Sequence, residues 1–71
     1  MSRNVYESRL RDQARIMVRL ERLARLSAHR GDVIRASELL AEREMVAVER
    51  SRLLRMAWDE RRQRAVEASP I

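Results

Sequence analysis

The chain of 71 residues contains a single glycine, Gly31, and a single proline, Pro70. These two residue types interrupt helices and form many of the turns between strands. The chain also has one Trp, one Tyr and no Phe, and so few of the aromatic residues that favour sheets. We therefore predict an all-α fold in which only Gly31 separates one helix from the next.

Two helices are predicted, over residues from about 5 to 29 and from about 33 to 67. Asn4 and Glu7 have the spacing of a capping box, which begins a helix. Gly31 can adopt the left-handed conformation that ends a helix, and Asp32 can cap the helix that follows. The chain is expected to be one helical-hairpin domain, residues 1–71, with short flexible ends at 1–3 and 68–71.

The alternative to a hairpin is one continuous helix, because a single glycine costs a helix only about 1 kcal/mol relative to alanine. The positions of the apolar residues favour the hairpin. If one straight helix ran through Gly31, the apolar stripes before and after it would differ in direction by roughly 130°. A tight turn at Gly31-Asp32 instead lets the two stripes face each other in an antiparallel hairpin, in which the numbers of facing residues sum to about 63.

The core of this hairpin is predicted to form where the two stripes meet, with the two aromatic residues in contact at its open end. Its predicted members are Tyr6, Leu10, Met17, Leu20, Ala24, Leu40, Ala47, Leu54 and Trp58. Other apolar residues of the second helix lie beside its stripe and form a candidate partner or dimer face: Ile34, Met45, Val48 and Met56. Two helices alone cannot cover all these groups, so we expect two hairpins to pack as a homodimeric, coiled-coil-like four-helix bundle.

Arginine carries all the positive charge, and the net charge of +5 arises in the first half of the chain. Eight arginines and three acids precede Gly31, whereas eight arginines and eight acids follow it. Arginine suits the recognition of carboxylate or phosphate, but a chain without lysine also follows from GC-rich codon usage.

Two groups of arginines are candidates for binding nucleic acid or an acidic partner. We call the first group, on the side of the first helix opposite its apolar stripe, the arginine ridge: Arg11, Arg15, Arg19, Arg22 and Arg25. The second group follows near the end of the chain: Arg61, Arg62 and Arg64. The alternatives are a solubilising surface whose arginines pair with the acids of the second helix, and a C-terminal cluster favoured by the helix dipole.

The sequence predicts no catalytic residue, no cofactor site and no metal site. The chain has no Cys and only one His, too few ligands for a zinc site. The adjacent carboxylates of Asp59 and Glu60 point about 100° apart on a helix, so they cannot act together on one bond. The longest uninterrupted apolar run, residues 45–48, is far shorter than the ~20 residues of a membrane span. We expect a soluble, cytoplasmic protein with no small-molecule substrate.

These observations predict a small non-enzymatic regulatory protein, of a kind suited to phages, mobile elements or bacteria, that dimerises and binds a partner protein through a helix face. The alternatives are a nucleic-acid-binding helical bundle that uses the arginine ridge, and a purely structural assembly subunit. The predicted architecture resembles ROP, a plasmid RNA-binding protein that dimerises as a four-helix bundle. The two share no sequence motif, so the resemblance assigns no role to any residue.

Overall fold

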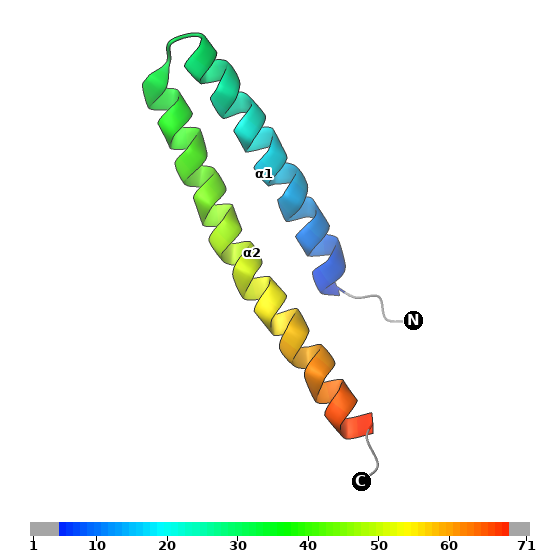
Figure 1. The fold of residues 1–71 in the computed structure, drawn as a ribbon. Coiled ribbons are helices and arrows are strands. Elements are labelled where there is room, and N and C mark those ends of the chain that lie inside the picture. Colours follow the sequence, from blue (N-terminus) through cyan, green and yellow to red (C-terminus); the bar gives the residue numbers. More distant parts are fainter. Residues whose placement is uncertain (1–4, 69–71) are drawn as a thin grey trace.

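The computed structural model describes residues 5–68, which form two helices, α1 (Val5–His29) and α2 (Val33–Ala68). The helices run antiparallel and are joined by a short turn, so that the start of α1 and the end of α2 lie toward the open end of the hairpin (Figure 1). The predicted all-α hairpin is confirmed, with α2 one residue longer than expected. Asn4, the predicted N-cap of the first helix, lies outside the described residues.

The turn has the hydrogen bonds that its sequence predicts. Gly31 has a φ of 83°, its N–H donates to the carbonyl of Ala28 (3.0 Å), and the N–H of Asp32 donates to the carbonyl of Ser27 (2.8 Å). This pair of bonds is a Schellman motif, which ends α1. The Asp32 carboxylate then accepts a bond from the N–H of Arg35 (3.0 Å) and caps α2.

Gly31→Val is expected to destabilise the hairpin by about 1 kcal/mol, because a residue with a side chain is strained at positive φ. A Cβ at this position would meet no atom within 4 Å, so the loss reflects backbone conformation and not a clash. Gly31→Asn is the matched control, since Asn tolerates the left-handed conformation. Urea unfolding should place the stability of the Asn variant between those of wild type and the Val variant, and three equal stabilities would contradict the expected strain.

The two helices pack in the predicted register. Glu21 of α1 forms an ion pair with Arg43 of α2, and the two residue numbers sum to 64. At the open end, Tyr6 and Trp58 line one shallow hollow and their numbers have the same sum. In this register the start of α1 is level with about residue 58 of α2, so the last ten residues of α2 extend beyond α1 by about 15 Å (Figure 1).

The contact between the helices follows a seven-residue repeat, as in a coiled coil. On α2, the buried or half-buried side chains that face α1 in this repeat are Ala36, Leu39, Arg43, Val46, Arg50, Leu53 and Ala57. Their counterparts on α1 are Tyr6, Leu10, Gln13, Met17, Leu20, Ala24 and Ser27. We call this line of contact the seam.

Three residues predicted for the hairpin core lie outside the seam and are exposed: Leu40 (51%), Leu54 (45%) and Trp58 (59%). This part of the prediction is wrong. Leu39 and Leu53 are buried in place of Leu40 and Leu54, so α2 is turned by about one residue, or 100°, from the expected orientation. Leucines occur in adjacent pairs on α2, and periodicity alone did not show which member of each pair faces α1. The other six predicted core residues are buried or half-buried: Tyr6, Leu10, Met17, Leu20 and Ala24, which lie in the seam, and Ala47, which lies beside it.

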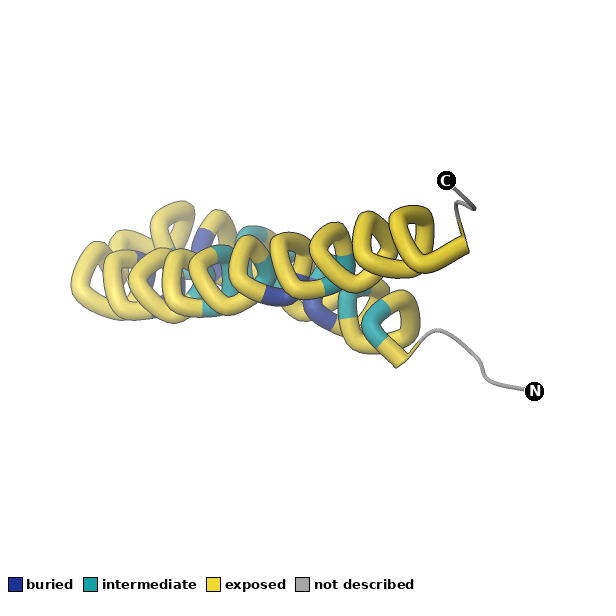
Figure 2. The backbone as a smooth tube through the Cα atoms, turned by 90° about the horizontal axis from the view of Figure 1, so that it is seen from below, coloured by how far each residue is buried: buried dark blue, intermediate teal, exposed yellow. Residues whose placement is uncertain are grey.

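The hairpin is a single layer of helices. Its Cα atoms extend over 62 × 21 × 10 Å, and their radius of gyration is 17.4 Å, whereas a compact chain of this length has a radius of about 11 Å. Of residues 5–68, only five are buried, and they lie where the helices face each other (Figure 2). Within that part of the chain, neither helix has a stretch apolar enough to cross a membrane.

Candidate functional site

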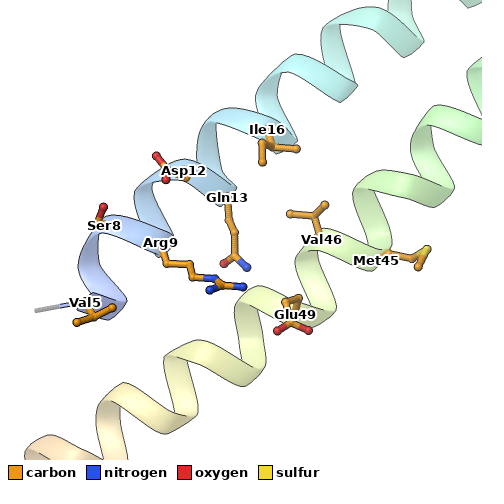
Figure 3. Close-up of a pocket in the computed structure, with 9 residues that line it drawn as sticks. All are labelled: Val5, Ser8, Arg9, Asp12, Gln13, Ile16, Met45, Val46 and Glu49. Atoms are coloured by element: carbon orange, nitrogen blue, oxygen red, sulfur yellow. The ribbon is translucent and has the colours of Figure 1, made fainter.

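The hairpin has two faces, one on each side of the seam, and both carry hollows between the helices. On the first face, which we call the broad face, the hollow has a volume of about 640 Å³. Its apolar side chains come from both helices and include Val5 and Ile16 of α1 and Met45 of α2. Gln13 and Val46 extend into the gap between the helices, whereas Met45 points away from it (Figure 3).

The broad face is apolar and nearly balanced in charge. The charged residues that line its hollow are Arg9, Asp12 and Glu49, and Glu49 is paired with Arg52 on the same helix (3.7 Å). The apolar residues Val5, Ile16 and Met45 are all exposed. Nothing in the described chain covers this apolar surface.

The four residues of the predicted partner or dimer face, Ile34, Met45, Val48 and Met56, are all exposed on α2. Met45 lines the hollow of the broad face. Ile34 and Met56 lie 11 residues before and after it, close to three helical turns, and therefore on the same side of α2. Val48 lies about 60° from Met45 around the helix. The structure thus brings three of the four residues onto one stripe beside the hollow.

The opposite face carries two smaller hollows, and we call it the cationic face. One hollow, of about 200 Å³, is lined by Ala14, Met17, Val18, Glu21, Arg43 and Arg50. The other, of about 140 Å³ at the open end, includes Tyr6, Leu54, Trp58 and Arg61. Leu54 and Trp58, which lie outside the seam, are therefore exposed beside Arg61 on this face.

The seam contains polar residues whose hydrogen-bonding groups are only partly satisfied. Arg43 is paired with Glu21, and both side chains are about one-third exposed (32% and 36%). Gln13 and Arg50, whose numbers sum to 63, lie in the same layer of the seam. The Oε1 atom of Gln13 and the Nε atom of Arg50 are both buried without a hydrogen-bond partner. The sequence analysis missed these residues, although the seven-residue spacing of Ala36, Arg43, Arg50 and Ala57 is a signal that places them together.

The arginine ridge is exposed along α1, and within residues 5–68 none of its five arginines forms an ion pair. Three acids of α2 instead pair with arginines of α2, as in Arg35–Glu38 (3.3 Å). Within residues 5–68 the ridge arginines therefore do not pair with the acids of the second helix, and their pairing with the acids of a neighbouring chain stays a prediction.

The ridge continues into the cationic face. Arg15, Arg19 and Arg22 line a further hollow, of about 470 Å³, together with Ala14 and Val18. Ala14 and Val18 also line the 200 Å³ hollow. The two surfaces therefore form one cationic region.

The second basic cluster is less uniform than the sequence suggested. Arg61 lines the hollow beside Trp58, Arg64 pairs with Glu60 (3.4 Å), and Arg62 is exposed. All three arginines lie on the part of α2 that extends beyond α1, and of the three only Arg61 lines a hollow of the cationic face.

Among the residues that the structure describes, no three His, Asp or Glu side chains are grouped so as to hold a metal ion. Comparison with protein-family models, with curated proteins and with solved structures finds no match to this chain.

Proposed function

We propose that this protein is a small non-enzymatic interaction protein that forms a homodimeric four-helix bundle through its broad face and binds a partner protein through another helix face. Such a protein suits a regulatory role in a phage, a mobile element or a bacterium. The observation that carries the proposal is the presence of exposed apolar side chains on both faces of a hairpin that is one layer thick. A domain normally needs a second layer to cover such groups.

Two faces with exposed apolar groups support two separate contacts. A dimer with twofold symmetry uses the same patch on both chains, and it therefore covers only one face of each hairpin. The face that remains is free to bind a different protein. This division supports partner binding in addition to dimerisation.

The broad face suits dimerisation better than the cationic face because of its charge. A twofold interface brings each patch against its own copy, so a patch with excess positive charge would repel itself. The broad face combines one arginine with two acids, and its apolar side chains belong to both helices. We therefore assign the second copy of the chain to this face.

Light scattering is expected to give twice the chain mass for the wild type at micromolar concentration. Ile16→Glu should shift the protein to the monomer, because it places a charge in the apolar hollow of the broad face. The matched control is Val18→Glu on the same helix, since Val18 is exposed to a similar degree (53% against 46%) but lines the cationic face. A folded wild-type monomer, or equal effects of the two substitutions, would contradict the assigned interface.

A second candidate function is nucleic-acid binding by the arginine ridge. The lack of ion pairs to its arginines within the described residues favours this candidate. Binding to phosphates releases counterions, so affinity for duplex DNA or RNA would fall steeply as salt is raised. Titration at low and physiological salt tests this candidate, and binding no tighter than about 10⁻⁴ M at physiological salt would exclude it.

A further inference from the structure

We infer that the cationic face binds an acidic amphipathic helix of a partner protein, whose carboxylates pair with Arg43 and Arg50. The inference rests on the proposed function, because it gives the chemistry of the partner that the remaining face would bind. It is carried by three features of this face: an arginine without a counterion, an exposed apolar stripe and an excess of positive charge.

Arg50 is the first of these features. It is half-buried in the seam, its Nε atom has no acceptor, and no carboxylate within residues 5–68 forms an ion pair with it. A guanidinium remains charged at physiological pH, and removing it from water without an opposite charge is unfavourable. The side chain borders the 200 Å³ hollow, where a carboxylate from outside can approach it. A partner's carboxylate would supply the missing acceptor.

The second feature is the apolar stripe on the same flank of α2. Leu40, Ala47 and Leu54 follow each other at intervals of seven residues, and Trp58 lies one turn beyond Leu54. Leu40, Leu54 and Trp58 are exposed, and Ala47 is half-buried between them. This stripe is about 27 Å long, which is the length of a helix of five turns. Amphipathic helices bind to apolar grooves through side chains spaced by one or two turns. The stripe therefore fits a partner helix with an apolar side of similar length.

The third feature is the charge around the stripe. The three hollows of this region are lined by six arginines but only two acids, Glu7 and Glu21. A partner with negative charge beside its apolar side complements this arrangement. Leucine and alanine side chains between the arginines favour a protein over a nucleic acid, whose backbone presents phosphates and sugars but no aliphatic stripe.

The arginines also define the spacing of the partner's acids. Arg43 and Arg50 are seven residues apart on α2, or about 10.5 Å along the axis. An antiparallel or parallel partner helix with acids seven residues apart presents its carboxylates at the same interval. Glu21 already pairs with Arg43, but a guanidinium has five N–H donors and can bind a second carboxylate.

The test uses the full chain and a synthetic helical peptide of about 20 residues, long enough to cover the stripe. The peptide contains leucines at intervals of three and four residues, glutamates seven residues apart and no tryptophan. Trp58 is the only tryptophan of the protein, so its fluorescence reports binding, and its emission is expected to shift to shorter wavelength. A peptide of the same composition in scrambled order should bind at least about tenfold more weakly, because it has the charge but not the apolar side.

Arg50→Gln is expected to weaken binding of the helical peptide by about tenfold or more, since a charge-assisted pair is lost. Arg52→Gln is the matched control: it removes one charge from the same helix, but Arg52 pairs with Glu49, which lines the broad face. Its effect should be less than about twofold. Leu54→Asp provides a second variant outside the seam, and it should also weaken binding because it removes an apolar contact and adds a charge of the same sign as the peptide's.

Three results would overturn the inference. The first is equal binding of the helical and scrambled peptides, which would indicate unspecific attraction of charge. The second is that duplex DNA or RNA binds more tightly than the helical peptide at physiological salt. The third is that Trp58 becomes shielded from acrylamide as the protein alone is concentrated, which would show that a second copy occupies this face.

The inference and the proposed dimer can fail separately. If Ile16→Glu yields a monomer that still binds the helical peptide, the two faces act independently, as proposed. If the wild type is monomeric and binds the peptide, the dimer is refuted but the inference about the cationic face is supported.

Discussion

Leu53→Ala is expected to destabilise the protein by about 2–5 kcal/mol, the usual cost of truncating a buried leucine. Leu53 lies in the seam and is 9% exposed, and only five of the described residues are buried in all. Because the core is so small, few other side chains lie close enough to Leu53 to move into the space left by its lost methyl groups. Urea unfolding followed by circular dichroism at a fixed, low protein concentration measures this loss.

Leu54→Ala is the matched control, because it removes the same atoms from the next residue of the same helix. Leu54 is 45% exposed on the cationic face, so its truncation should cost less than about 1 kcal/mol. If the two variants lose equal stability, or if Leu54→Ala loses more, α2 does not have the orientation described above. The comparison therefore tests which member of the leucine pair faces α1.

Arg50→Met is expected to stabilise the hairpin by about 1–2 kcal/mol, and so to raise the melting temperature by about 5 °C or more. The substitution removes a charge that has no counterion among the described residues and an Nε–H group that has no acceptor. An unbranched apolar side chain in its place extends the apolar seam between Val46 and Leu53. Differential scanning calorimetry measures the change.

Arg52→Met is the control for this prediction, since Arg52 has an exposed side chain (65%) and its replacement should change stability by less than about 0.5 kcal/mol. A loss of stability in Arg50→Met would contradict the expected result and would indicate that Arg50 stabilises the folded chain. A gain in stability together with weaker binding of the acidic helix would show that Arg50 serves binding at the expense of folding.

Local signals in the sequence determined the secondary structure. Gly31 and Asp32 end one helix and begin the next through bonds to residues at most five positions away, so a short stretch of chain contains all the information for the turn. The register follows as well, because two helices that rise equally from one turn must bring together residues with a constant sum. The position of the arginine ridge was equally predictable, since a helix has a fixed angle per residue.

The tertiary structure decided which side of α2 faces α1. The apolar residues of α2 lie on several sides of the helix, so Leu39 and Leu40 were equal candidates for the seam. The prediction from sequence placed Leu40 there, whereas Leu39 is the one that is buried. In the structure α1 packs against the side that contains Arg43 and Arg50. This packing is possible because arginine can lay its aliphatic stem along an apolar surface and because Glu21 lies level with Arg43 to pair with it. The same rotation leaves Leu40, Leu54 and Trp58 exposed, and it thereby creates the apolar stripe of the cationic face.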